Sequence, residues 1–212
     1  MNILAFDTST EKFSISILKN NKIVFNLSKI LYKSYSKFLI SLLQTSLKKT
    51  KLDLKKIDLI LISLGPGSFT GIRLGIAAAK GMALPHKINI LGFNNMEILA
   101  NSVSTLGENN KKIVTIIKSK KNDYYFQVFN TKRKPLTKIS FFSINNLPKF
   151  FFNKNVVFSG DLDVNLIKEI KKRKNKFFFY KKKFSNARML INLIKEKNYI
   201  NKKKFLDPIY VY

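Results

Sequence analysis

The chain has 212 residues, with 40 Lys and Arg against 12 Asp and Glu, so its formal charge is +28; it has one His and no Cys. These counts exclude zinc sites built on cysteine, disulfide scaffolds and cysteine nucleophiles, and a single His cannot supply the paired imidazoles of most catalytic metal centres. The hydrophobic fraction of 45% is that of a packed globular protein, and the length suits one large domain or two small lobes.

The first half of the chain predicts a β-β-β-α-β-α-β-α order. Alternating apolar residues predict strands at 2–7, 12–19 and 22–31, with Asn20-Asn21 as a hairpin turn between the last two. Apolar residues at helical spacing then predict a helix of about four turns from Tyr35. A buried strand at 57–64, a glycine loop with its helix, a strand at 88–92 and a helix at about 94–105 follow.

The second half predicts a similar order. Strands are expected at 113–117, 123–130, 136–142, 155–158 and 177–180, and helices at 162–173 and 187–197. The repeated order predicts an α/β fold of two tandem actin-like or RNase-H-like lobes (ASKHA-type), with mixed sheets flanked by helices. We place the boundary near Gly107, which gives an N-terminal lobe at 1–106 and a Lys-rich C-terminal lobe at 107–212.

The N-terminus gives no sign of export. Asp7 interrupts it before an apolar signal-peptide core forms, and no window holds the ~20 apolar residues that span a bilayer. We therefore expect a cytoplasmic protein that does not associate with a membrane.

The positive charge is mostly an excess of Lys in the second half: residues 106–212 carry net +19 and residues 1–105 net +9. Lys is encoded by A/T-rich codons, so an A/T-rich genome would explain an excess of lysines at solvated positions. A run of aromatic residues at 177–180 lies between basic residues, which is also typical of a single-strand nucleic-acid platform. The candidate RNA contacts are Lys171, Lys172, Arg173, Lys174, Lys181, Lys182 and Lys183. The favoured alternative is a short buried strand with solvated lysines at both ends.

The window 57–110 differs from the rest because its three bases balance three acids. It contains the motif Gly65-Pro-Gly-Ser-Phe-Thr-Gly71, which joins a buried strand to a helix. Such a loop suits an anion at a helix N-terminus, although it lacks the Gly-Lys-Ser/Thr ending of a P-loop. The candidate nucleotide or phosphate loop comprises Asp7, Ser9, Gly65, Gly67, Ser68, Thr70 and Arg73.

The helix after this loop has a face of small residues. Gly71, Gly75 and Ala79 recur every four residues, and each interior glycine costs roughly 1 kcal/mol relative to alanine. A compensating close contact is therefore expected, either with the protein's own sheet or with a partner subunit, or with both. The candidate partner interface comprises Tyr35, Leu39, Leu42, Gly71, Gly75, Ala78, Ala79 and Met82.

These motifs resemble the TsaB (YeaZ) family of the bacterial tRNA threonylcarbamoyladenosine machinery. The resemblance rests on Asp7-Thr-Ser-Thr10, on the eleven residues from Gly65 to Gly75, and on the Ala-rich helix that continues to Leu84. Weaker matches are Ser159-Gly160-Asp161, the helix at 187–193 and Asp207-Pro-Ile-Tyr210. Lys118-Ser-Lys120 replaces a usual Asp-Ala-Arg run, and the chain ends at Tyr212, so we expect reduced C-terminal contacts.

The resemblance implies a subunit without catalysis of its own. Family members bind and activate the TsaD transferase and act with the TsaE ATPase to form N6-threonylcarbamoyladenosine at position 37 of tRNAs that read codons starting with A. It implies no cofactor of the chain's own, ATP or ADP at most at the boundary with a partner, and a metal that belongs to the transferase. Whether the free chain forms a homodimer stays open.

His86 is expected to be a loop residue, and Asp7 is expected to cap its turn. The alternatives are a small-molecule kinase or ATPase of the same fold, or a basic RNA-binding module.

Overall fold

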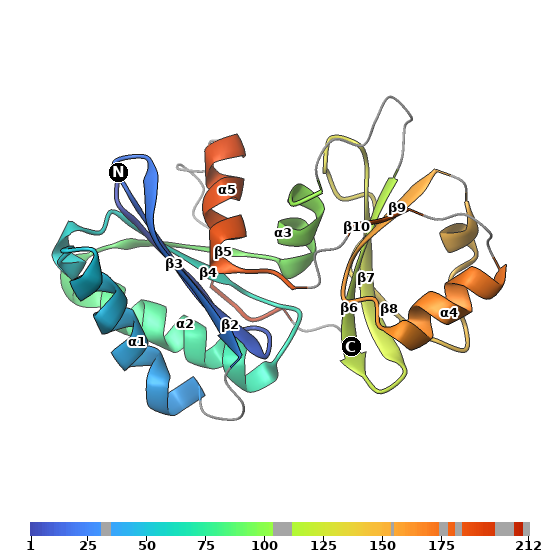
Figure 1. The fold of residues 1–212 in the computed structure, drawn as a ribbon, viewed down its shortest axis with the longest axis horizontal. Helices are drawn as coiled ribbons and strands as arrows, with labels where there is room; N and C mark the ends of the chain where they lie inside the picture. Colours follow the sequence, from blue (N-terminus) through green and yellow to red (C-terminus); the bar gives the residue numbers. More distant parts are fainter. Residues whose placement is uncertain are drawn as a thin grey trace. The chain divides into compact units, whose positions relative to one another are not determined.

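The computed structural model describes residues 1–30, 35–103, 112–153, 155–173, 178–180, 184–197 and 206–209. Contacts within the chain divide it into two compact units. The first comprises Met1–Asn95 and Asn186–Ile209, and the second comprises Met96–Ser185 and Tyr210–Tyr212. Each unit contains one five-stranded mixed sheet, which confirms the two predicted lobes with mixed sheets (Figure 1).

The sheet of the first unit has the order β3-β2-β1-β4-β5. Its strands are β1 (Ile3–Asp7), β2 (Lys12–Lys19), β3 (Lys22–Ile30), β4 (Leu59–Ser63) and β5 (Asn89–Phe93). The first three pair antiparallel, whereas β1, β4 and β5 run parallel. Asn20 and Asn21 have φ of 48° and 62°, as a tight hairpin turn requires. The predicted hairpin is thus confirmed.

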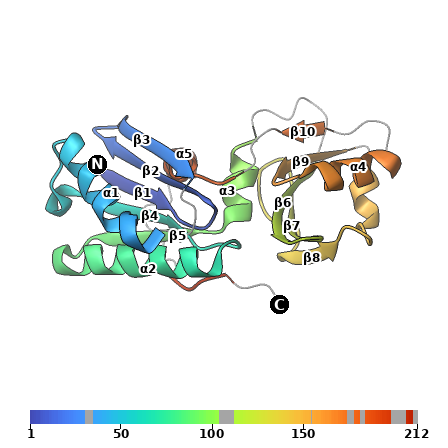
Figure 2. The same ribbon diagram turned by 60° about the horizontal axis from the view of Figure 1, so that its bottom comes forward.

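Helices cover both faces of this sheet (Figures 1 and 2). They are α1 (Tyr35–Lys49), α2 (Phe69–Ala83) and α5 (Ala187–Lys197), with short 3-10 turns η1 (Leu54–Lys56) and η2 (Leu84–His86). Helices α1 and α2 share one core with the sheet, formed around Phe6, Phe13, Leu39 and Ile72. Helix α5 lies against β1, β2 and β4 on the other face.

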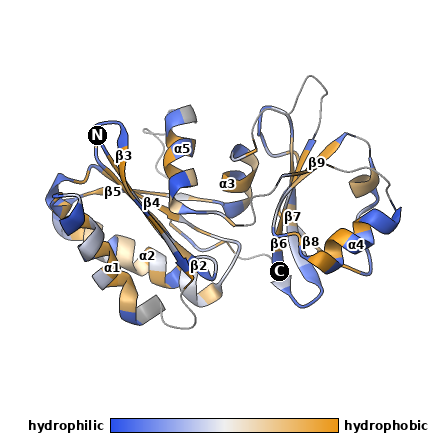
Figure 3. Cartoon of the chain, viewed as in Figure 1, coloured by the Kyte–Doolittle hydropathy of each residue, from blue (hydrophilic) through white to orange (hydrophobic). Residues whose placement is uncertain are grey.

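The sheet of the second unit has the order β10-β9-β6-β7-β8. Its strands are β6 (Lys112–Lys120), β7 (Asp123–Phe129), β8 (Ser140–Ser143), β9 (Val156–Gly160) and β10 (Phe178–Tyr180). Helix α4 (Val164–Arg173) and the turn η3 (Lys149–Phe152) share a core with one face, and α3 (Asn95–Asn101) contributes to a second core. In Figure 3 hydrophobic residues lie along much of the strands, while hydrophilic residues gather at turns and at the ends of strands and helices.

The two sheets have the same topology. Read from its far end, the second sheet is β8-β7-β6-β9-β10, with the same antiparallel and parallel pairs as the first. The final helix of each half, however, packs in the unit of the other half. Met96 of α3 is buried with Ile113 and Val157, and the Ala187 N–H of α5 donates to Ser14 Oγ at 2.9 Å.

This exchange corrects the predicted division at residue 106. The second unit begins at Met96, and residues 187–197, predicted to belong to the C-terminal lobe, are part of the first unit. An amphipathic helix shows which of its faces is buried but not against which sheet.

The predicted elements agree with the structure apart from local shifts. The strand expected at 136–142 is observed at Ser140–Ser143, and the three 3-10 turns were not predicted. The strand predicted at 177–180 is observed at Phe178–Tyr180, but it is an edge strand and not a buried one. Phe178 is 53% exposed, so the prediction of a wholly buried aromatic run is wrong.

Candidate functional site: the Asp7 turn, the glycine loop and helix α2

The fully buried carboxylate of Asp7 organises the carboxyl end of β1. Its Oδ1 accepts hydrogen bonds from the Ser9 N–H at 2.8 Å, from Ser9 Oγ at 2.6 Å and from Ser63 Oγ at 2.6 Å. The predicted capping of the turn is confirmed. Three donors of the same chain thus converge on one oxygen of this buried acid.

Asn95 ties the same turn to the glycine loop. Its side-chain amide nitrogen donates to Ser9 Oγ at 2.7 Å and to the Pro66 carbonyl at 2.9 Å, and its backbone N–H donates to the Gly65 carbonyl at 2.7 Å. Sequence reasoning missed this residue. The available signal was a polar residue two positions beyond a strand whose carboxyl end lies beside those of β1 and β4.

The glycine loop lies directly on the Asp7 turn. The Ser68 N–H donates to the Ser9 carbonyl at 2.7 Å, and the Gly71 N–H donates to Ser68 Oγ, the N-cap of α2, at 3.2 Å. A Cβ at Gly67 would overlap the Ser9 carbonyl oxygen. Since two loop N–H groups bond within the chain, Ser68 and Gly71 do not offer their N–H groups to a phosphate.

The small-residue face of α2 packs on Thr8. The Thr8 hydroxyl donates to the Gly71 carbonyl at 2.7 Å. A Cβ at Gly71 would overlap the Thr8 carbonyl oxygen, and one at Gly75 would overlap Thr8 Oγ1. The close contact that these glycines need is therefore made within the first unit.

This packing revises the candidate interface. Of its residues, Leu39, Gly71, Gly75, Ala78 and Ala79 are buried in the first unit. Leu42 and Met82 are half-buried, and the side chain of Tyr35 lies outside the part that the structure describes. The five buried residues cannot form a surface, so packing on the chain's own sheet is the correct interpretation for them.

Phe38 on α1 and Phe69, Thr70 and Arg73 at the start of α2 are exposed on two helices that share one core, and we refer to these four residues together as the α1–α2 face. Phe38 is 47% and Phe69 55% exposed. The Arg73 guanidinium carbon lies 3.7 Å from the centroid of the Phe69 ring, a cation–π geometry. Exposed aromatics with an arginine are typical of protein interfaces.

In the second unit, Lys118 pairs with Asp163 at the start of α4. Asp163 Oδ2 accepts from Lys118 Nζ at 2.5 Å and from the Tyr124 hydroxyl at 2.9 Å, while Oδ1 accepts from the Leu166 N–H. Burial opposes ionisation of Asp163, but the three donors hold the pKa of its carboxyl below the usual value. Burial, followed by the bond to Asp163, raises the pKa of Tyr124 far above its usual value. Lys118 thus has a structural role at the start of α4.

The candidate RNA contacts are only partly described. Lys171, Lys172 and Arg173 form the exposed last turn of α4, where Lys172 Nζ donates to Glu169 Oε1 at 2.6 Å. Lys174, Lys181, Lys182 and Lys183 lie outside the described residues. An RNA platform on this unit stays a prediction.

His86 lies exposed in η2, as expected of a loop residue. Among the residues that the structure describes, no group of three or more His, Cys, Asp or Glu is placed to hold a metal ion. Within the same residues, no helix is both long and apolar enough to cross a membrane.

Comparison with known proteins gives the family. A family model described as TsaD, tRNA N6-adenosine threonylcarbamoyltransferase, matches residues 28–196. The tRNA threonylcarbamoyladenosine biosynthesis protein TsaB of Buchnera aphidicola subsp. Baizongia pistaciae is 31% identical over 99% of this chain and 97% of its own length. A transferase of Thermodesulfovibrio yellowstonii is 29% identical but covers 46% of this chain and 34% of its own.

Solved structures agree on the fold. YeaZ from Pseudomonas aeruginosa superposes with a TM-score of 0.80 at 17% identity and covers 99% of both chains. A protein of Bacteroides thetaiotaomicron with an actin-like ATPase fold gives a TM-score of 0.50 at 15% identity, over 92% of this chain and 95% of its own. The predicted actin-like fold is confirmed, and the end-to-end match is to relatives named TsaB.

Proposed function

Because the chain belongs to the TsaB family, and its residues 28–196 also match the family model of the TsaD transferase, we propose that it is a non-catalytic subunit in tRNA threonylcarbamoyladenosine biosynthesis. In this role it binds and activates a TsaD-like transferase. The product is N6-threonylcarbamoyladenosine at position 37 of tRNAs that read codons starting with A.

The observation that carries the proposal is the α1–α2 face. It presents two aromatic rings and an arginine in the half of the chain that has the smaller net positive charge. Fully desolvated aromatic and arginine side chains contribute most of the binding energy of many interfaces. A partner on this face would cover the exposed parts of the Phe69 and Phe38 rings.

The non-catalytic part of the proposal rests on the Asp7 turn. Its carboxylate accepts three hydrogen bonds from its own chain, and the glycine loop lies on the turn through the Ser68 N–H. In the proposed complex the metal belongs to the transferase, a TsaE-like ATPase is the third component, and tRNA is bound through the assembly. ATP or ADP at a partner boundary and a homodimer of the free chain remain part of the hypothesis.

Reconstitution with TsaD, TsaE, tRNA and the threonylcarbamoyl adenylate tests the proposal. Omission of this chain should abolish modification, and Phe69→Glu should weaken co-purification with TsaD and reduce modified tRNA to the same extent. Phe141→Glu is the matched control, because Phe141 is a similarly exposed phenylalanine of the second unit. Modification of tRNA in the absence of this chain would refute the proposed role. Unchanged modification with Phe69→Glu would refute the proposed face.

A further inference from the structure

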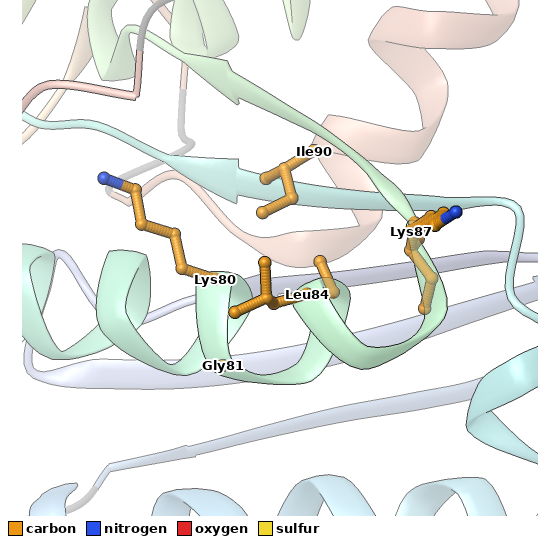
Figure 4. A pocket seen from close by; sticks show the side chains of 7 residues that line it. Lys80, Gly81, Leu84, Lys87 and Ile90 are labelled. Carbon is orange, nitrogen blue, oxygen red and sulfur yellow. The ribbon is translucent and has the colours of Figure 1, made fainter.

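A hollow of about 560 Å³ opens on the first unit at the C-terminal end of α2. Its volume lies in the ~300–1,000 Å³ range of ligand sites. Ala83, Leu84, Ile88 and Ile90 provide its apolar lining. Figure 4 shows Ile90 directed into it from β5, with Lys80 and Lys87 at opposite ends.

Its apolar lining is open to water. Leu84 is 82% exposed, the largest fraction among the exposed large hydrophobic residues of the described chain. A Cβ at the neighbouring Gly81 would have no atom within 4 Å, so α2 leaves open space at this wall. An aliphatic side chain held in water beside an unfilled hollow favours an apolar side chain of another molecule as its occupant.

The adjoining strand offers backbone groups to an extended segment. Among the described strands β5 is the last of its sheet, and its neighbour β4 runs parallel to it. The Phe93 carbonyl accepts from Leu64 on the β4 side. Because alternate residues of a parallel strand bond to the same neighbour, the backbone groups of Ile90 and Gly92 face the edge at which the described residues form no further strand. An extended peptide that pairs with such an edge places alternate side chains in adjacent pockets.

Two lysines give the hollow a positive charge within an otherwise neutral part of the sequence. In the neutral window 57–110 the only basic residues are Arg73, Lys80 and Lys87, and two of these three flank the hollow. Within the described part of the chain neither lysine makes an ion pair. They would repel a second copy of this +28 chain, and a nucleic-acid backbone would gain nothing from the apolar lining.

We propose that this hollow docks an extended acidic segment of another protein. One aliphatic or aromatic side chain packs on Leu84, Ile88 and Ile90, and flanking carboxylates pair with Lys80 and Lys87. The site is separate from the α1–α2 face, and neither depends on the other.

The test uses the full chain and a peptide of about ten residues with a central Leu between glutamates. Titration should shift the methyl resonances of Leu84, Ile88 and Ile90 with saturation. Leu84→Ser, and separately Lys80→Glu with Lys87→Glu, should each weaken binding about tenfold or more. Lys37→Glu with Lys48→Glu is the matched charge control on α1, where both lysines are exposed, and it should retain binding.

Several results would overturn the proposal. One is the absence of saturation by about 1 mM peptide, the weak end of the affinity scale. Another is equal binding of a peptide with Ser in place of Leu, or an equal loss in the α1 control, because either would show attraction to charge alone. Tighter binding of a uridine oligonucleotide or of dodecanoate at the same methyl groups, or self-association that Leu84→Ser removes, would assign the hollow to a different occupant.

Discussion

The Thr8 hydroxyl donates a hydrogen bond to the Gly71 carbonyl across 63 residues of sequence, at 2.7 Å. The contact brings the turn after β1 against the first turns of α2 so closely that neither Gly71 nor Gly75 has room for a Cβ. Gly71 and Gly75 of the glycine motif therefore make an internal contact of the first unit. Their role at any partner surface is indirect, through the position of α2, whereas Phe69 and Arg73 of the same motif are exposed.

Gly71→Ala should destabilise the protein. The new Cβ would overlap the Thr8 backbone carbonyl, which cannot move without shifting the turn, and overpacking of this kind costs about 1–3 kcal/mol. Gly81→Ala is the control from the same helix, because its Cβ would meet nothing within 4 Å. It should stabilise the fold by about 0.5–1 kcal/mol. Urea unfolding at pH 7 measures both; a Gly71→Ala protein as stable as Gly81→Ala would contradict this packing.

Asp7→Ala should lower the free energy of unfolding by about 3 kcal/mol. It leaves the Ser9 N–H and the hydroxyls of Ser9 and Ser63 without their acceptor, and a buried unsatisfied polar group costs about 1–3 kcal/mol. Asp58→Ala removes a surface carboxylate that accepts from the Asn2 N–H, and it should cost about 1 kcal/mol or less. Chemical denaturation of the two variants provides the comparison, and equal losses would argue against a structural role for the Asp7 turn.

Local pattern predicted most of the fold. Alternation identified β1 to β3, Asn20-Asn21 identified the hairpin, and helical spacing identified α1. The exchange of α3 and α5 between the units was not predictable in this way, since the partner of an amphipathic helix depends on contacts far apart in sequence. Ala187, for example, bonds to Ser14 over 173 residues.

The sequence predicted where the candidate site lies but not which side chains its residues contact. Spacing indicated that Gly71 and Gly75 make a close contact, yet spacing cannot name Thr8 as the neighbour. Asn95 was missed because a single asparagine carries no period. The 3-10 turn η2 leaves Leu84 exposed near Lys87, and no periodic pattern in the sequence predicts this turn.

The stability contributed by Asp163 should depend on pH. The pKa of its carboxyl is held below the usual value despite burial, by Leu166, Lys118 and Tyr124. Its stabilising contribution is therefore present above about pH 4 and is lost as the pH falls through the folded-state value. Asp163→Asn should be less stable than the parent at pH 7, and the difference should shrink below about pH 4. Glu11→Gln, at an exposed carboxylate, should show no difference at pH 7. A difference for Asp163→Asn that stays constant down to pH 2 would exclude this linkage.

We expect no measurable binding of Mg-ATP to the isolated chain. If a nucleotide bound at the candidate phosphate loop, the turn after β1 and the loop before α2 would have to receive its phosphates. Here the Ser68 N–H donates to Ser9, the Gly71 N–H donates to Ser68 Oγ, and the Asp7 carboxylate accepts three bonds from the chain. A phosphate would have to displace these contacts. Isothermal titration should therefore give only heats of dilution, with a TsaE-like ATPase in the same buffer as the positive control. Saturable binding that Asp7→Asn abolishes would instead favour a kinase or ATPase.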